Sequence, residues 1–221
     1  MPTYTEDFTT IPYGPLGIIA TPGCEELAEK IDRYIVEWRA SRESEHKSTI
    51  AFADYQRDSY LVNVKFPRFG SGEGKALITQ SVRGYDLFIL TDVFNYGETF
   101  KMYDMVVPMS PDDHYANLKR AIAAVAGKAH RISVIMPMLY EGRQHKRSSR
   151  ESLDCAIALQ ELCLTMGVDN IITFDAHDAR VQNAIPLHSF ENVSTVYQMI
   201  KALVNTVDNL KIDKENLMII S

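Results

Sequence analysis

Apolar residues recur along the chain with helical spacing in some segments and with strand-like spacing in others. Over residues 25–42 they come every three or four positions between charged side chains, which predicts an amphipathic helix. The run at 60–66 is rich in β-forming residues and ends at Pro67, so we expect a strand there. A second extended run at 75–80 follows a glycine-punctuated turn.

From residue 86 onward, short apolar strands alternate with helical segments. We predict strands at 86–92, 131–139, 170–175 and 216–220, and helices at 110–126, 152–166 and 194–204. Pro111, placed between a serine and two acids, is typical of a first helical turn. Nearly continuous apolar strands that alternate with helices indicate βαβ units. The sequence therefore predicts an α/β fold with a mainly parallel sheet covered on both faces.

The segment 93–109 separates one of these strands from its helix and exceeds the roughly 2–6 residues usual for such loops. It contains four aromatic residues, Phe94, Tyr96, Phe100 and Tyr103. We expect an ordered excursion or a partner contact there, and not a flexible tether.

Composition narrows the class of protein. The chain has 221 residues, 46% of them hydrophobic, and its 23 basic and 29 acidic side chains give a net charge of −6. These values fit a globular protein and argue against a general binder of nucleic acid or acidic membranes. The three cysteines lack CxxC spacing, so we expect buried reduced thiols. With no signal peptide and no apolar run of roughly 18 residues, we expect a cytoplasmic protein without a membrane partner.

Candidate chemistry gathers after the predicted strands, where ligands bind in open α/β sheets. Asp175, His177 and Asp178 follow one strand and offer two carboxylates and an imidazole. Strand alternation places Asp175 and His177 on one side, where both can serve a divalent cation. A solvated strand end explains the same residues equally well, and the local pattern leaves both readings open.

A basic run follows the neighbouring strand, with cations at 143, 145, 146, 147 and 150. Guanidinium groups beside a helix start suit phosphate oxygens, whereas the plain alternative is a solvated basic turn. The position of the run opposite Asp175 and His177 favours phosphate binding. Glycines at 70, 72 and 74 have a superficial likeness to a dinucleotide fingerprint, but an extended run follows them, so we expect a hairpin turn.

Four landmarks occur in a set order: residues 68–73 (Arg-Phe-Gly-Ser-Gly-Glu), 81–89 (Ser-Val-Arg-Gly-Tyr-Asp-Leu-Phe-Ile), the pair Arg143 and Gln144, and 175–178 (Asp-Ala-His-Asp). Together they resemble the ribose-phosphate pyrophosphokinase family (phosphoribosyl pyrophosphate synthetase). The resemblance runs from about residue 68 to the end, with 93–110 as an insertion. It is weaker over 1–67, which we expect to form a divergent helix and strands of the same domain.

The resemblance implies a phosphoribosyltransferase-like three-layer α/β/α domain with an adenine-binding β-hairpin, one of two such domains in the family. The family assembles into dimers to hexamers. It transfers the diphosphoryl group of Mg-ATP to the C1 hydroxyl of ribose 5-phosphate, giving phosphoribosyl pyrophosphate (PRPP) and AMP. Mg²⁺ is therefore the implied cofactor, and ATP, ribose 5-phosphate and further copies of the chain are the implied partners.

The resemblance also implies roles for single residues. Phe69 stacks on adenine and Glu73 accepts from its amino group, both across a subunit interface. Arg143 and Gln144 match the pair that contacts ATP.

Three further residues are implied with their neighbours. His177 matches the metal-binding histidine, and Asp175 is its acidic companion. Gln182 matches a glutamine of the phosphate or effector region, to which we also assign Arg147 from the basic run.

Departures from the family pattern indicate a divergent member. Ser71 stands where the family usually has an adenine-contacting aspartate, His145 follows the Arg-Gln pair in place of aspartate, and Asp178 replaces a small residue. The family's catalytic loop and its ribose-phosphate loop belong to the second domain and are absent from these residues. We therefore expect the ATP-side half of the enzyme, with no catalytic residue of its own and no activity alone.

Two other interpretations remain open. A non-catalytic relative that regulates an active synthetase is consistent with Ser71, His145 and the absent half, and the reading frame past Ser221 discriminates it. A generic flavodoxin-like nucleotide-binding module predicts no role for residues 69–73, so Glu73→Ala would leave its ATP affinity unchanged.

Overall fold

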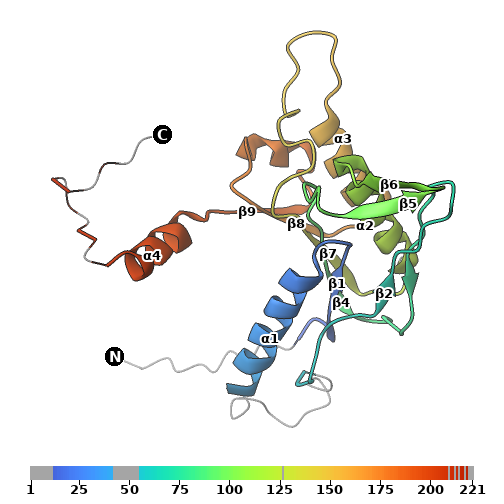
Figure 1. Ribbon diagram of the computed structural model, residues 1–221, viewed down its shortest axis with the longest axis horizontal. Helices are drawn as coiled ribbons and strands as arrows, with labels where there is room; N and C mark the ends of the chain where they lie inside the picture. Colours follow the sequence, from blue (N-terminus) through green and yellow to red (C-terminus); the bar gives the residue numbers. More distant parts are fainter. Residues whose placement is uncertain are drawn as a thin grey trace.

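The computed structural model describes residues 12–41, 55–125, 127–208, 210–211, 213, 215–216 and 218. Its centre is a five-stranded sheet in the order β1-β4-β7-β8-β9, in which every neighbouring pair is parallel (Figure 1). The strands are β1 (Leu16–Ala20), β4 (Asp86–Leu90), β7 (Arg131–Ile135), β8 (Asn170–Phe174) and β9 (Ser189–Val193). The predicted α/β fold with a mainly parallel sheet is confirmed.

Helices and two small hairpins complete the described part. The helices are α1 (Glu25–Ser41), α2 (Pro111–Val125), α3 (Asp154–Gln160) and α4 (Val196–Thr206). Helix α3 continues into a π-helical turn (Glu161–Thr165), and a 3-10 helix spans Ala179–Ala184. The antiparallel hairpins pair β2 (Val64–Lys65) with β3 (Leu77–Ile78) and β5 (Thr99–Met102) with β6 (Met105–Pro108).

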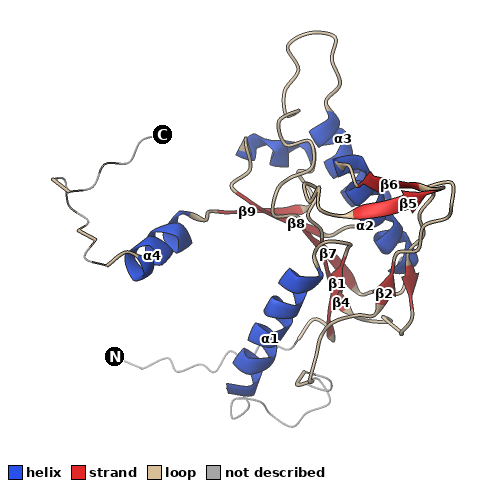
Figure 2. Ribbon diagram, viewed as in Figure 1, coloured by secondary structure: helices blue, strands red, loops and turns tan. Residues whose placement is uncertain are grey.

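Two clusters of buried apolar side chains, one on each face of the sheet, define three layers (Figure 2). Ile19 belongs to the larger cluster, together with Leu118 of α2 and residues of α3. Its neighbour Ile18 belongs to the smaller cluster, with Leu90 of β4 and Ala28 of α1. Successive strand residues point to opposite faces, so adjacent isoleucines serve different layers.

An ion pair ties the starts of the two central strands together. Arg131 donates from Nε to Oδ1 of Asp86 at 2.8 Å and from Nη2 to Oδ2 at 2.5 Å. Asp86 lies largely out of solvent, and burying an unpaired carboxylate costs free energy. The two hydrogen bonds from Arg131 supply the partner that this carboxylate needs. It joins strands 45 residues apart in sequence at the edge opposite the candidate site.

The sequence analysis missed both outer strands of the sheet. Strand β1 is an apolar run interrupted by Gly17, a residue with low strand propensity. Strand β9 is mostly exposed and contains Glu191 and Asn192, so its apolar pattern is too weak to indicate a strand. Both strands exist because β4 and β8 each offer a free edge for pairing.

The expected strand at 60–66 is shorter than predicted because two partners share the segment. Tyr60 and Val62 bond to Ile18 of β1 in a single parallel bridge, with N–O distances of 2.8 Å. The chain then turns away, and only Val64–Lys65 pairs with β3. The predicted hairpin around residues 70–74 is confirmed by this pairing and by an antiparallel bridge between Arg68 and Gly74.

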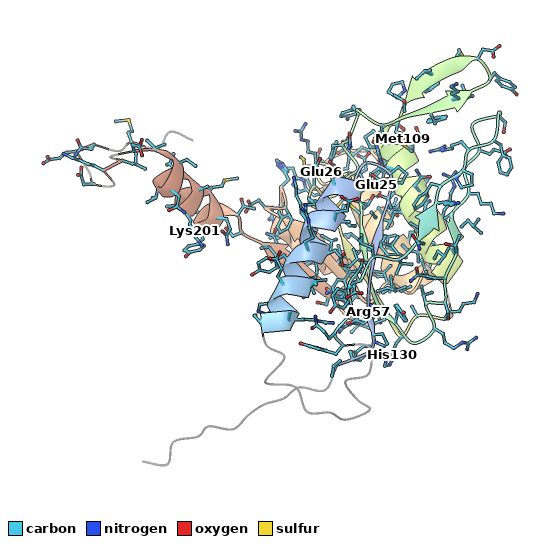
Figure 3. All side chains as sticks on the ribbon, turned by 60° about the horizontal axis from the view of Figure 1, so that its bottom comes forward. Glu25, Glu26, Arg57, Met109, His130 and Lys201 are labelled. Carbon is cyan, nitrogen blue, oxygen red and sulfur yellow. The ribbon has the colours of Figure 1, made fainter. Side chains whose placement is uncertain are left out.

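The segment 93–109 forms the β5–β6 hairpin, which projects from the body near Met109 (Figure 3). Helix α4 extends from the opposite side of the molecule (Figure 3). None of its residues, 196–206, is buried. The strand expected at 216–220 lies mostly outside the described residues, and Asn216 is part of a turn. Among the described helices, none combines the length and apolar character needed to cross a bilayer.

Candidate functional site

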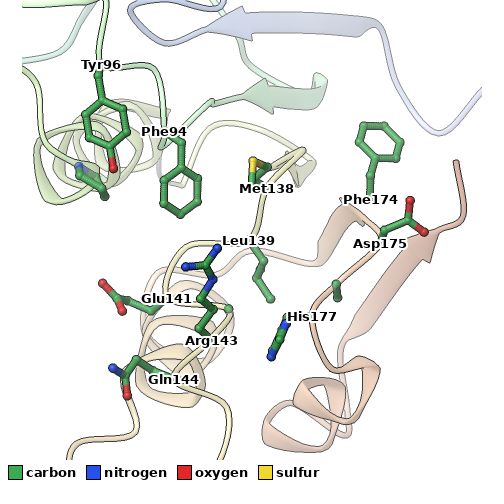
Figure 4. A pocket seen from close by; sticks show the side chains of 13 residues that line it. Phe94, Tyr96, Met138, Leu139, Glu141, Arg143, Gln144, Phe174, Asp175 and His177 are labelled. Carbon is green, nitrogen blue, oxygen red and sulfur yellow. The ribbon is translucent and has the colours of Figure 1, made fainter. Parts of the chain in front are cut away.

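A cavity of about 660 Å³ opens at the carboxyl ends of β7 and β8. The loop after β7 lines one wall, and residues 174–177 after β8 line a second (Figure 4). Phe94 and Tyr96, from the loop after β4, and Pro111, at the start of α2, complete the lining. This is the edge at which parallel α/β sheets bind ligands, so the topology and the cavity agree.

Arg143 and Gln144 both line the cavity, from a loop that is held at its base. Leu139 is buried, and the amide of Gly142 donates to its carbonyl at 3.1 Å. Glu141 has a positive φ of 54°, which turns the chain before the Gln144 amide donates to the Glu141 carbonyl at 2.8 Å. The turn directs the Arg143 side chain into the cavity, with its guanidinium beside Phe94 in this view (Figure 4).

A second anchor fixes this loop to helix α2. The hydroxyl of Tyr140 donates to Oδ1 of Asp112 at 2.5 Å, and its ring stacks on Tyr115 with centroids 4.2 Å apart. Burial and this hydrogen bond raise the pKa of Tyr140, so its hydroxyl stays protonated and remains a donor. The loop that carries Arg143 is therefore held by its own backbone bonds and by helix α2.

His177 and Asp175 line the same cavity from the end of β8. Asp175 has a positive φ of 42°, and its carboxylate accepts hydrogen bonds from the hydroxyl and the amide of Thr195. The imidazole of His177 lies at the cavity wall, on the side of the Arg143 side chain (Figure 4). Arg143 and His177 thus line one cavity.

The cavity also contains an acid that sequence analysis did not single out. Partial burial raises the pKa of Glu141, and the nearby carboxylates of Asp154 and Asp112 raise it further. A carboxylate here opposes a bound polyanion unless it is protonated, so Glu141 works against the cations of the same loop.

Phe69 and Glu73 do not line the cavity; they lie on the turn between β2 and β3. Two backbone bonds close this turn, from Phe69 N to Glu73 O at 2.8 Å and from Gly72 N to Phe69 O at 2.9 Å. Phe69 is 58% exposed, and the hydroxyl of Ser71 donates to Glu73 at 2.9 Å. The turn therefore presents a ring and a carboxylate to solvent.

The β5–β6 hairpin packs against this turn. The amide of Tyr103 donates to the Gly70 carbonyl at 2.8 Å, and the guanidinium of Arg68 lies 4.3 Å from the Phe100 ring centre. Gly72 has a φ of +90°, and a Cβ there would lie 3.0 Å from the sulfur of Met102. The segment 93–109 thus contacts the turn that carries Phe69.

Arg147 and Gln182 lie outside the cavity lining, and both side chains are exposed. Phe94, Tyr96, Met138 and Phe174 line it instead, and sequence analysis assigned none of them to the site. Phe94 and Tyr96 follow β4, so their position after a parallel strand is the feature of the sequence that indicates a place at the site. All three cysteines are buried and free, as expected.

One known protein family matches more than half of the chain. The family model described as the N-terminal domain of ribose phosphate pyrophosphokinase matches residues 16–167. The chain belongs to this family. The match begins well before residue 68, so the resemblance reaches further toward the N-terminus than the landmarks indicated, and it ends before the 175–178 landmark.

Relatives agree with the membership, and a solved structure shares the fold. Ribose-phosphate pyrophosphokinase 3 of Saccharomyces cerevisiae is 24% identical over 157 residues, covering 70% of this chain and 45% of the relative. Ribose-phosphate pyrophosphokinase B of Dictyostelium discoideum is 28% identical over 134 residues, covering 60% and 36%. The crystal structure of phosphoribosylpyrophosphate synthetase from Mycobacterium smegmatis matches with a TM-score of 0.62 and 20% identity, over 86% of this chain and 52% of that chain. The chain spans about half or less of the length of these relatives.

Two departures from the pyrophosphokinase pattern prove to be partners. His145 Nε2 lies 3.4 Å from Oδ2 of Asp178, and His145 Nδ1 lies 3.1 Å from the Arg143 carbonyl. The His145 ring also meets His177 edge-on, with centroids 5.2 Å apart. One histidine therefore connects the arginine loop of this pyrophosphokinase-family chain to the segment after β8.

Asp178 itself is held in its charged form. Hydrogen bonds from the side chain and the amide of Arg180 lower its pKa well below the ordinary value. Asp178 also caps the 3-10 helix that begins at Ala179. Its carboxylate is thus engaged outside the cavity and does not serve as a third ligand beside Asp175 and His177.

The residues at the cavity fit a magnesium ion that takes few of its ligands from the protein. Within the described ranges, no group of three or more His, Cys, Asp or Glu side chains is arranged to hold a metal alone. Mg²⁺ commonly takes one or two protein ligands and completes its shell with water and substrate phosphates. At the cavity wall Asp175 offers one carboxylate and His177 an imidazole, so the rest of the shell would come from water and a phosphate.

Proposed function

We propose that this chain is the ATP-side half of a ribose-phosphate pyrophosphokinase. The whole enzyme transfers the diphosphoryl group of Mg-ATP to the C1 hydroxyl of ribose 5-phosphate. The hydroxyl oxygen forms a bond to the β-phosphorus, the bond from that phosphorus to the α-phosphate oxygen breaks, and AMP leaves. One observation carries this proposal: Arg143 and His177, from loops after adjacent parallel strands, face one cavity.

Arg143 and Gln144 bind the phosphates of ATP in this proposal. A guanidinium donates two parallel hydrogen bonds to phosphate oxygens, and charge-assisted bonds of this type are stronger than neutral ones. Gln144 adds a neutral amide donor from the adjacent position. Phosphoryl transfer requires charge neutralisation and alignment more than covalent help, so these groups suit the reaction.

Asp175 and His177 are the proposed ligands of the magnesium ion. When bound, the ion neutralises phosphate charge and fixes the triphosphate in one orientation. The hydrogen bonds from Thr195 orient the Asp175 carboxylate, and the contact with His145 orients the His177 ring. Gln182 and Arg147 remain candidates for a phosphate or effector region outside the cavity.

Phe69 and Glu73 are proposed to hold adenine in a neighbouring copy of the chain. Both are exposed and lie outside the cavity of their own chain, so a second copy can reach them. The resemblance to the family implies an assembly from dimer to hexamer. The Ser71 hydroxyl occupies one carboxylate oxygen of Glu73 and leaves the other to accept from the adenine amino group. The serine therefore acts through Glu73, in place of the direct contact that an aspartate makes.

The ribose 5-phosphate site and the catalytic loop belong to a second domain in this proposal. Helix α4 supports a further partner, because Tyr197, Met199, Ile200 and other apolar residues of this helix are exposed. Without that domain the two substrates are not aligned, a term worth about 7–11 kcal/mol in favourable cases. We therefore expect no turnover from these 221 residues alone.

The test combines binding with turnover. Arg143→Ala is expected to weaken binding of inorganic tripolyphosphate about 10- to 150-fold in calorimetric titrations, the range for a lost charged hydrogen bond. Arg33→Ala, on the exposed face of α1, removes the same charge elsewhere and is the matched control. Equal affinity for both variants would refute the phosphate site. AMP release with ribose 5-phosphate at rates near those of full-length enzymes would refute the expected inactivity.

The alternative is a non-catalytic, regulatory homologue of the synthetase. Ser71 and the His145–Asp178 pair favour it, because both replace family residues near the nucleotide. A regulator binds Mg-ATP but lacks an intact ribose-phosphate loop in the sequence beyond Ser221. Sequencing that region of the gene distinguishes the two functions.

A further inference from the structure

The walls of the cavity differ in chemistry. Arg143, Gln144 and His177 form a polar wall, whereas Phe94 and Tyr96 form an aromatic one on the other side (Figure 4). Phe94 packs partly against the core, but Tyr96 is 60% exposed. A ligand that fits both walls has an anionic part and a flat, unsaturated or sugar-like part.

The loop after β4, which carries the aromatic wall, is fixed by side-chain hydrogen bonds. The fully buried imidazole of His114 donates from Nε2 to the Asn95 carbonyl at 2.8 Å. The Asn95 side chain donates to the Gly23 carbonyl at 3.2 Å and accepts from the Gly97 amide at 3.0 Å. The residue between the two aromatics is therefore fixed on three sides.

Close packing adds to these hydrogen bonds. Gly23 has a φ of +88°, and a Cβ at this position would lie 2.5 Å from the Asn95 amide nitrogen. The Phe94 amide also donates to Oδ1 of Asp92 at 3.0 Å, at the point where the loop leaves β4. Because this anchoring already orders the loop, a ligand loses less free energy in fixing Phe94 and Tyr96 when it binds.

We propose that Phe94 and Tyr96 form a stacking surface for the nucleoside part of the nucleotide bound in the same chain, with Asn95 and His114 as positioning residues. The inference rests on the proposed function, which places the phosphates at Arg143. It adds a ring contact that needs no neighbouring copy, in contrast to Phe69. The cavity of a single chain then holds both ends of the nucleotide.

Two ligands separate this contact from phosphate binding: ATP, and inorganic tripolyphosphate, which has no ring. Stacking of a base on an aromatic side chain is worth enough to change affinity about 5- to 150-fold on truncation. Tyr96→Ala is expected to weaken ATP binding by this factor in calorimetric titrations of the full chain, with tripolyphosphate unchanged. Tyr96→Phe retains a ring and is expected to restore ATP affinity.

Two more variants complete the set. Asn95→Ala removes the side-chain anchors and leaves both rings, and it is expected to weaken ATP binding about 2- to 10-fold without changing tripolyphosphate binding. Tyr34→Ala removes a ring that is 70% exposed on α1 and serves as the matched control. Selective loss in Tyr96→Ala, rescue by Tyr96→Phe and no effect of Tyr34→Ala support the stacking surface.

Two outcomes overturn the stacking surface, and a third separates it from the proposed phosphate site. If Tyr96→Ala weakens both ligands equally, the residue supports the loop and does not stack. If Phe69→Ala weakens ATP binding and Tyr96→Ala does not, the neighbouring copy alone holds the ring. If Tyr96→Ala weakens ATP binding while Arg143→Ala has no effect on either ligand, the stacking surface stands and the proposed phosphate site fails.

Discussion

Two regions of this chain resemble the nucleotide contacts of a pyrophosphokinase: the loop after β7 and the turn between β2 and β3. They differ in their position relative to the cavity. The loop after β7 carries Arg143 into a cavity that β8 closes from the other side. The turn after β2 carries Phe69 away from that cavity and into solvent. The first region lies within one chain because parallel strands end at one edge, whereas the role proposed for the second requires a neighbouring copy.

The two regions also differ in what holds them. Tyr140 stacks on Tyr115 and fixes the loop to helix α2, which is part of the main core. The turn is supported by the β5–β6 hairpin, itself a projection from the body, through Met102 and Tyr103. A change in the turn should therefore leave the cavity intact, and the reverse should also hold.

The largest expected effect comes from a side chain at Gly72. Gly72→Ala places a methyl group 3.0 Å from the Met102 sulfur at a φ of +90°, and such strain costs about 1–3 kcal/mol of the free energy of unfolding. Urea denaturation measures that loss, and tripolyphosphate binding at the cavity should be unchanged. Gly70→Ala is the control, because nothing lies within 4 Å of its Cβ position. A fall in tripolyphosphate affinity in Gly72→Ala would show that the two regions are coupled.

A smaller effect is expected from the contact that joins the two walls of the cavity. His145→Ala should weaken tripolyphosphate binding about 2- to 5-fold, in the range of a partly exposed ion pair. The lowered pKa of Asp178 keeps its carboxylate charged, so it remains an acceptor for the His145 ring. A double-mutant cycle with Asp178→Asn isolates the pair. Strictly additive losses would mean that the loops are positioned independently.

The smallest effect concerns Glu141. The pKa of Glu141 is raised by partial burial and by Asp154 and Asp112, so lower pH neutralises a carboxylate that repels phosphates. Glu141→Gln should therefore bind tripolyphosphate about 2- to 5-fold more tightly at neutral pH and lose part of the pH dependence. The same change should raise stability at neutral pH, since a carboxyl with a raised pKa destabilises the fold once it ionises. Unaltered binding in this variant would place Glu141 outside the phosphate subsite.

Sequence analysis recovered the elements that have a strong pattern. Helices α1 and α2 and strands β4, β7 and β8 lie within the predicted ranges, since each has a long apolar stripe or an apolar run. Strands β1 and β9 were missed, because pairing with an existing sheet edge, and not their own composition, makes them strands. The long helix predicted at 152–166 divides into α3 and a π-helical turn, a change of backbone that periodicity does not register.

The grouping of Arg143 with His177 was predicted for the same reason. Alternating strands and helices determined a parallel sheet, and a parallel sheet places the loops after β7 and β8 side by side, so both residues line one cavity. The tertiary structure alone decided that His145 pairs with Asp178, that Thr195 holds Asp175, and that Tyr96 joins the cavity. Glu141 and Asp175 leave the strands with positive φ values, and side-chain directions beyond such turns depend on packing between distant segments. Local hydrophobic spacing contains no information about those encounters.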